Sequence, residues 1–287
     1  MDTPAHTDSF LVRHEFLIRR LHSLSGLIPV GAYMCVHLLV NATILDSAST
    51  FQSQVNRIHS LGKLLPVVEW TFIFIPILFH AIVGVVIVRS GLPNSGNYPY
   101  AKNIRYTLQR VTGMIAFVFI LWHVLHMHWM GGPLGGGQFN PHHAASSAGT
   151  ALSQSSVLIP LAYAVGILSC VYHLANGLWT MGITWGVWTS AAAQRRANYV
   201  CIVFGLLLGA VGLSALGGFA TMDEQQIEAD RQIENRMEEA QRFVLGETDE
   251  ADAEEAEQEE DAESEAGDDK SAAADASADE TVAQLSN

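Results

Sequence analysis

The sequence contains long stretches without a single Asp, Glu, Lys or Arg. Residues 21–45, 111–194 and 197–222 have none of these four residue types, and the second stretch covers 84 consecutive positions. A bilayer core about 30 Å thick needs roughly 20 mostly apolar helical residues, and charged side chains at its centre cost several kcal/mol each. A soluble domain of this length would need a charged surface. The pattern therefore excludes a soluble fold for residues 1–222.

Cysteine is also scarce. Cys35, Cys170 and Cys201 all lie in apolar stretches, and there is no CxxC or CxxCH motif. Covalent haem attachment, zinc ribbons and ordinary iron–sulfur ligation are therefore unsupported, and we interpret the three as small apolar core residues. A cleaved signal peptide is not expected either, because residues 1–20 are polar with no apolar run before their arginines.

The charges that are present are segregated along the chain. Residues 1–222 carry 11 Lys and Arg against 5 Asp and Glu, a net of +6, whereas residues 223–287 carry 4 against 24, a net of −20. Residues 222–246 favour an amphipathic helix, and residues 247–287 are too poor in apolar side chains to fold and should be disordered. We interpret this acidic tail as a solvated spacer, with cation or partner binding as the alternative; no nucleic-acid partner is expected. The apolar positions of the helix are Ile233, Met237, Ala240 and Val244.

The apolar stretches predict an all-α membrane protein with five transmembrane helices in residues 24–221, after a cytoplasmic N-terminal segment, residues 1–23. The spans cover roughly residues 24–45, 65–88, 108–130, 157–183 and 198–221. Residues 131–156, rich in Gly and Ser, are expected to form a loop.

Basic residues favour the cytoplasmic side, and nine lie in or beside the loops on the N-terminal side against two on the other. The nine are Arg13, Arg19, Arg20, Arg89, Lys102, Arg105, Arg110, Arg195 and Arg196. The two are Arg57 and Lys63. This count predicts a cytoplasmic N-terminus and, after five spans, an external C-terminus.

Four of the twelve histidines lie well inside four different spans. Histidine within a span is costly and marks a functional site by default. With a rise of 1.5 Å per residue, the four fall at two depths, an outer pair and an inner pair roughly 10 Å apart. The outer pair is His37 with His123, and the inner pair is His80 with His173.

Two histidines at one depth on facing helices suit the two axial positions of a haem iron, so the pattern predicts a haem-binding bundle with two haems. Three glycines fall on or near the faces of the ligands, where a porphyrin needs close backbone approach: Gly84, Gly166 and Gly177. Glycine is also common between packed membrane helices, and intramembrane histidines also serve as proton relays in transporters.

Glu69 is the one carboxylate within a predicted span. It lies 11 residues before His80, which is three helical turns and nearly the same face. It could exchange protons with a quinone near the outer haem, or it could be an interfacial residue that reaches water. Six of the other eight histidines are expected to be interfacial (His126, His128) or solvated (His6, His14, His142, His143).

The chain resembles the cytochrome b558 membrane anchor of succinate dehydrogenase (succinate:quinone oxidoreductase), in its one-subunit, five-helix, two-haem form. The resemblance covers about residues 13–220 and rests on several segments in order. These are RRLHSLSGLIPVG (19–31), HLLVN (37–41), LFHAIVG (78–84), LQRVTG (108–113), WHV (122–124) and YHLANGLW (172–179).

The resemblance implies that His37 and His123 bind an outer, low-potential haem b and that His80 and His173 bind an inner, high-potential haem b. It also implies a bacterial cell membrane location, a role in respiratory complex II and the tricarboxylic acid cycle, and reaction with menaquinone. The implied partners are a flavoprotein and an iron–sulfur subunit on the cytoplasmic side, within a complex that can itself oligomerise. Arg19, Arg20 and His22 are candidates for contacting haem propionates or the docked subunit, although ordinary positive-inside anchoring explains the arginines equally well.

Two features depart from this family. The acidic tail has no family role known to us, and position 171 is a valine where some related fumarate reductases carry a glutamate. One alternative is the di-haem cytochrome b anchor of a hydrogenase or a formate dehydrogenase, which shares the haem pattern but not the quoted segments. The other alternative is a proton-coupled transporter.

Overall fold

The computed structural model describes residues 13–91, 96–98, 100–129, 137–153 and 156–245. Within these residues the regular structure is helical. The bounds of the α-helices are α2 (Glu15–Leu27), α3 (Pro29–Ala42), α4 (Ala48–His59), α5 (Leu65–Glu69), α6 (Ile75–Ser90), α7 (Ala101–Met127), α8 (Ala144–Ser153), α9 (Leu158–Thr184), α10 (Ala191–Ala220) and α11 (Glu224–Leu245). Short 3₁₀ turns cover Thr43–Leu45, Gly62–Leu64 and Pro141–His143.

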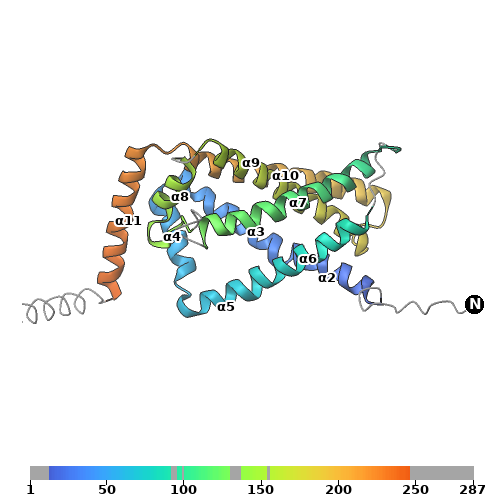
Figure 1. Ribbon diagram of the computed structural model, residues 1–287, viewed down its shortest axis with the longest axis horizontal. Helices are drawn as coiled ribbons and strands as arrows, with labels where there is room; N and C mark the ends of the chain where they lie inside the picture. The colour runs from blue at the N-terminus through green and yellow to red at the C-terminus, as the bar shows by residue number, and fades with distance from the viewer. Residues whose placement is uncertain (1–12, 92–95, 99, 130–136, 154–155, 246–287) are drawn as a thin grey trace, which may run out of the picture. The chain divides into compact units, whose positions relative to one another are not determined.

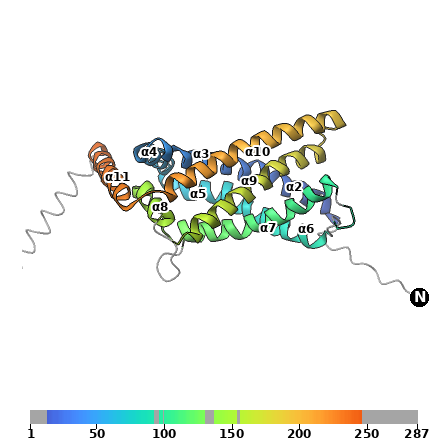
Figure 2. The ribbon, with the colours of Figure 1, turned by 90° about the horizontal axis from the view of Figure 1, so that it is seen from above.

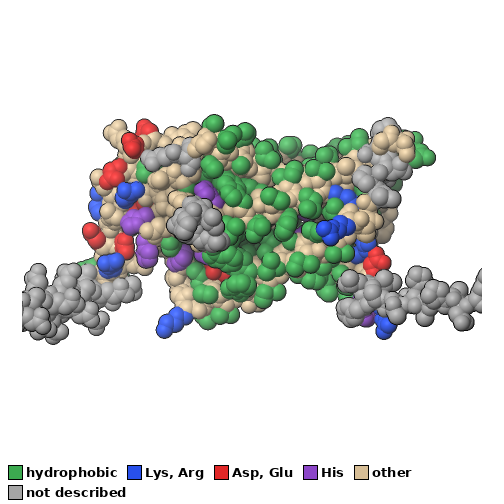
Figure 3. Space-filling view, viewed as in Figure 1, with side chains coloured by type: hydrophobic (Ala, Val, Ile, Leu, Met, Phe, Trp, Pro, Cys, Tyr) green, Lys and Arg blue, Asp and Glu red, His purple; other side chains and the backbone are tan. Residues whose placement is uncertain are grey.

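Five helical stretches are long and apolar enough to cross a membrane, as the sequence predicts. They run over Glu15–Leu45, Gly62–Ser90, Asn103–Met127, Leu158–Thr184 and Ala191–Ala220. The main spanning helices α3, α6, α7, α9 and α10 run side by side along the bundle (Figures 1 and 2). On the face shown in Figure 3, apolar side chains predominate between the two ends of the bundle. Large apolar side chains of the spanning stretches are exposed, Phe72 and Leu206 among them. The protein is therefore a multi-pass membrane protein.

The first span begins earlier than the sequence predicts. The boundary at residue 24 rested on the lack of charge after it, but helix α2 already begins at Glu15. Arg19 forms an ion pair with Glu15 one turn earlier, at 2.7 Å, and Arg20 donates to the backbone carbonyl of Thr184 on α9. Long arginine side chains can lie along a helix while their charged ends find polar partners, so they do not end the helix.

The second span contains a π-helical turn, Trp70–Phe74, between α5 and α6. It ends two residues before Pro76, which has no N–H to continue the α-helical hydrogen bonding. A π turn inserts one extra residue, which rotates the preceding helix by roughly 100° relative to an uninterrupted α-helix. The prediction that Glu69 and His80 share one face of a regular helix is therefore wrong.

Two short helices lie together at the end of the bundle opposite to α2, which we call the outer end (Figure 1). Helix α4 lies between the first two spans, and α8 lies inside the segment 131–156 that was expected to be a loop. Both are rich in buried side chains, and Phe51 of α4 packs edge-on against Phe219 of α10. We call the opposite end, with α2 and the connection between α9 and α10, the inner end.

The predicted amphipathic helix is present as α11, and Asp223 caps its first turn by accepting a hydrogen bond from the backbone N–H of Gln226 at 2.7 Å. Its Ile227 is buried in the same apolar cluster as Phe51 and Phe219. The chain divides into two compact units, of which the first ends at Glu234. The predicted disordered tail, residues 247–287, lies outside the described residues.

Candidate haem-binding site

The structure brings the four intramembrane histidines together in the two pairs that their depths predict. The ring centres of His37 and His123 are 5.9 Å apart, and those of His80 and His173 are 6.0 Å apart. The four residues come from α3, α7, α6 and α9 respectively. When two imidazoles bind one metal ion from opposite sides, each metal–nitrogen bond is about 2 Å long. With the distance from each nitrogen to its ring centre added, the two ring centres lie about 6 Å apart.

Backbone carbonyls fix the chemistry of the inner pair. Nδ1 of His80 lies 2.9 Å from the carbonyl oxygen of His22, and Nδ1 of His173 lies 3.0 Å from that of Gln109. A carbonyl can only accept a hydrogen bond, so Nδ1 must carry the proton in each neutral ring. Nε2 then keeps its lone pair in both residues. This is the tautomer that binds a metal through Nε2, with the other nitrogen held by an outer partner.

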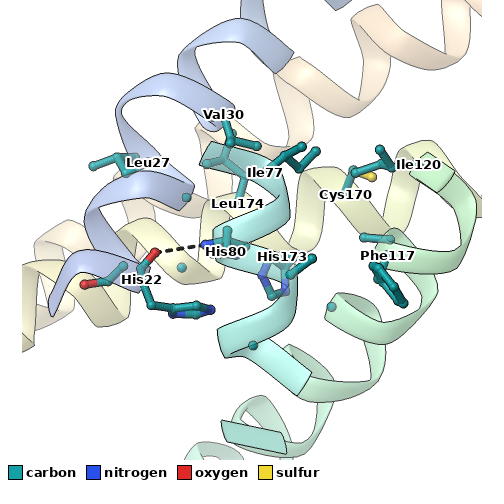
Figure 4. Close-up of a pocket in the computed structure, with 18 of the residues that line it drawn as sticks. His22, Leu27, Val30, Ile77, His80, Phe117, Ile120, Cys170, His173 and Leu174 are labelled. Atoms are coloured by element: carbon teal, nitrogen blue, oxygen red, sulfur yellow. Dashed lines mark hydrogen bonds between the residues drawn. The ribbon is translucent and has the colours of Figure 1, made fainter. Parts of the chain in front are cut away.

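The inner pair borders a cavity of about 700 Å³. Most of its lining is apolar, and Figure 4 shows His80 and His173 among side chains such as Val30, Ile77 and Leu174. This volume lies within the range of sites for cofactors and small molecules. His37 and His123 do not line this cavity.

Glycines make room for the inner imidazoles. A methyl group at Gly26 would overlap the ring of His80, and one at Gly113 would lie 2.8 Å from that of His173. Of the three glycines singled out from the sequence, Gly84 and Gly177 line the cavity as expected. Gly166 does not, because its open side is filled by the ring of Phe119.

The residues considered for propionate contact lie at the inner end of the cavity. Arg19, Arg20 and His22 all line it, and the ring of His22 stacks on that of His80 with centres 4.1 Å apart. The guanidinium of Arg20 also lies over the rings of Phe16 and Trp185.

A polar network supports His173 from the inner end. The Arg105 guanidinium donates to the side-chain oxygens of Asn176 at 2.8 Å and Asn198 at 2.6 Å, and it lies 4.0 Å over the ring of Trp179. The Asn176 amide in turn donates to the side chain of Gln109 at 2.7 Å. This network ties α7, α9 and α10 together beside the ligand.

Glu69 is half-buried and does not line the cavity, but its neighbour Trp70 does. The charge of Glu69 acts on His59, at the end of α4. Burial lowers the pKa of His59, the nearby Glu69 charge opposes that shift, and His142 and His128 reinforce it. Beside Glu69, the rings of Trp70, Phe74 and Trp129 pack with centres 4.8 to 6.2 Å apart.

The sequence did not single out Tyr163, and it placed His126 at the interface. The structure joins both to the outer pair: the Tyr163 hydroxyl lies 3.2 Å from Nδ1 of His123 and 2.9 Å from Nδ1 of His126. A tyrosine near the start of a span could have been a signal, because a buried phenol needs a hydrogen-bond partner. Asn41 is the neighbour of the other outer histidine, and its amide donates to the backbone carbonyl of His37 at 2.8 Å.

Among the described residues, no group of three or more His, Cys, Asp or Glu side chains could hold a bare metal ion. A haem iron asks for only two protein ligands. The spacing of both histidine pairs therefore fits haem, and the inner pair also has the matching ring chemistry and a cavity beside it.

No family model matches the chain. A comparison with curated proteins finds the succinate dehydrogenase cytochrome b558 subunit of Bacillus subtilis (strain 168), which is 36% identical over 205 residues. The match covers 71% of this chain and 97% of the relative. It is thus nearly complete for the relative and leaves more than a quarter of this chain unmatched. The chain belongs to the succinate dehydrogenase cytochrome b558 subunit family.

Proposed function

We propose that this chain is the di-haem membrane anchor of a bacterial succinate:quinone oxidoreductase. The observation that carries the proposal is the inner pair, in which two backbone carbonyls hold the Nδ1 protons and leave the Nε2 of both rings unprotonated. When bound, two b haems would supply one-electron carriers at two depths in the membrane. His80 and His173 would hold the inner group, and His37 and His123 the outer one.

The bundle's own residues explain how such a path is insulated. The mostly apolar lining of the cavity offers water few hydrogen-bonding partners beside the inner pair. Electrons from succinate would enter at the inner end, through a flavoprotein and an iron–sulfur subunit docked near the basic residues there. Menaquinone is the proposed acceptor, near the outer pair, with Glu69 as the group that exchanges its protons.

The proposed orientation places the inner end in the cytoplasm. Nine basic residues lie in or beside the segments at that end, against Arg57 and Lys63 in the first segment at the outer end. Positive residues are retained on the cytoplasmic side during membrane insertion. A protease-protection assay on whole cells tests this: cleavage of α11 from the outside supports the orientation, and protection of α11 in intact cells contradicts it.

A reduced-minus-oxidised optical spectrum of the purified complex tests the function directly. We expect about two b haems per chain, together with copurified flavin and iron–sulfur subunits. Copurification with hydrogenase or formate dehydrogenase subunits would instead favour the alternative di-haem anchor. A preparation that is folded but free of haem would refute the cytochrome function and reopen the transporter alternative.

His80→Ala is the matching variant. It should remove one haem and uncouple succinate oxidation from quinone reduction, whereas His128→Ala, at the exposed end of α7, should keep both haems. Retention of two haems in His80→Ala would refute the ligand assignment.

A further inference from the structure

Tyr163 of α9 lies against the outer histidine pair and is only 5% exposed. Its hydroxyl oxygen is within hydrogen-bonding distance of Nδ1 in both His123 and His126. These histidines are three residues apart on α7 and therefore lie on one face of that helix. One buried hydroxyl thus joins two imidazoles across the interface between α7 and α9.

A single hydroxyl has one proton, so it can donate to one of these nitrogens while it accepts from the other. If it donates to His126, then His123 must donate from Nδ1, and Nε2 of His123 keeps a free lone pair. If it donates to His123, then Nε2 of His123 carries the proton and cannot bind iron. Only the first arrangement is compatible with His123 as a ligand.

Aromatic packing restricts the His123 ring as well. The ring of Phe119 stacks on it with centres 5.7 Å apart and an interplanar angle of 21°. Phe119 fills the open side of Gly166, one turn along α9 from Tyr163, and meets the Tyr163 ring edge-on with centres 5.4 Å apart. The stretch of α9 from Tyr163 to Gly166 therefore contacts both the Nδ1 of His123 and the Phe119 ring that stacks on His123.

We propose that Tyr163 is a positioning residue for the outer haem: it fixes the orientation and the tautomer of His123, and His126 accepts its O–H bond. The inference rests on the proposed haem ligation, and it concerns the outer haem alone. The inner ligands use backbone carbonyls for the same purpose and are independent of Tyr163.

The test uses the intact complex with Tyr163→Phe in the anchor. Without an acceptor for its Nδ1–H, His123 becomes a less basic ligand and stabilises ferric iron less. We expect a raised midpoint potential and an altered electron paramagnetic resonance signal for the outer haem, or a 10- to 100-fold loss of its affinity. The inner haem should keep its signal and potential. Tyr199→Phe, at an exposed position of α10, is the control and should match the parent.

A second variant pair separates the hydrogen bond from general packing. His126→Gln keeps an acceptor oxygen for the Tyr163 hydroxyl and should stay close to the parent. His126→Phe removes that acceptor, so the hydroxyl can donate to Nδ1 of His123 instead and favour the tautomer that cannot bind iron; the outer haem should then bind more weakly. An outer haem unchanged in Tyr163→Phe, or equal changes in both haems, would overturn the positioning role. A parent complex without b haem would instead overturn the proposed function.

Discussion

A buried carboxylate holds the beginning of α11 against the outer end of the bundle. Glu234 is fully buried, and its two side-chain oxygens accept hydrogen bonds from the first turn of α8. The backbone N–H of Ala145 donates to one oxygen at 2.6 Å, and the hydroxyl of Ser146 donates to the other at 2.6 Å. We call residues 224–234 the strap.

The strap is also held by apolar contacts. Ile227 of the strap and Met222, two residues before the strap begins, pack against Gly149 of α8, where an added methyl group would collide with Met222. On its other side, α8 is held by Gln52 of α4, whose amide oxygen accepts from the N–H of Ala144 at 2.8 Å. Two side chains from distant parts of the sequence therefore satisfy the N–H groups at the start of α8, which a helix cannot satisfy itself.

The cost of removing Glu234 follows from these bonds. A hydrogen bond to a charged group contributes about 1.5–3 kcal/mol, and partners left buried without an acceptor add to the loss. Glu234→Ala should therefore destabilise the docked strap by about 3 kcal/mol or more. Glu234→Gln keeps one acceptor oxygen, and its amide group can donate to the Ser146 hydroxyl, so it should cost about 1 kcal/mol or less.

The pH dependence has a definite sign. Burial raises the pKa of Glu234, although hydrogen bonds from Ser146 and Ala145 oppose the shift. A carboxyl whose pKa is raised in the docked state stabilises docking most at pH values below its ordinary pKa. This stabilisation is lost as the pH rises through the raised pKa of the docked state. The strap should therefore be held more firmly at pH 5 than at pH 8, and Glu234→Gln should remove this difference.

Hydrogen exchange of the chain in lipid nanodiscs measures this docking. Peptides covering 224–234 and 144–149 should exchange on the order of 100-fold faster in Glu234→Ala, after correction for the intrinsic pH dependence of exchange. Glu238→Ala is a control, because Glu238 forms its ion pair with Arg242 within α11. Exchange in Glu234→Ala equal to that of the parent would refute the clamping role. A pH difference that persists in Glu234→Gln would show that another group is responsible.

Three further predictions concern the membrane bundle. Gly26→Ala should displace an inner-pair imidazole and alter the inner haem spectrum. Gly217→Ala should leave both haems unchanged, because no side chain or other helix lies within 4 Å of the added methyl group apart from its chain neighbours. Arg105→Lys loses the planar guanidinium that donates to both Asn176 and Asn198, so it should lower the free energy of unfolding by about 2 kcal/mol. The unfolding temperature of the complex should fall accordingly, and an unchanged melting curve would contradict this. Glu69→Gln should slow quinone reduction while succinate still reduces the haems, and a parental turnover rate would remove Glu69 from the quinone site.

The sequence predicts the spans well because a membrane imposes one strong rule. Charged side chains are so costly in a bilayer that charge-free apolar stretches of about 20 residues indicate spans, and within them the fixed rise of a helix converts residue numbers into depths. That is why the pairing of His37 with His123 and of His80 with His173 follows from numbers alone. The same rule fails at Glu69, because a local π turn changes the rotation without changing the hydropathy.

The outer end is harder to predict because its helices carry no such signal. Helix α8 consists largely of Ala, Ser and Gly, and its burial depends on Gln52 from one side and on Glu234 from the other. Both partners lie more than 80 residues away in sequence. A local pattern of small residues is equally typical of a loop, so only the tertiary contacts decide that this segment is helical.

The two histidine pairs differ in how their orientation is secured, and this difference decides which substitutions in this chain can affect each pair. In the inner pair both Nδ1 atoms meet backbone carbonyls, which no substitution of His22 or Gln109 can remove as long as the helices keep their places. In the outer pair the Nδ1 of His123 depends on one side chain, Tyr163, which a single substitution can delete. Changes in sequence can therefore retune the outer site, where the quinone is proposed to react, and leave the inner site unaltered.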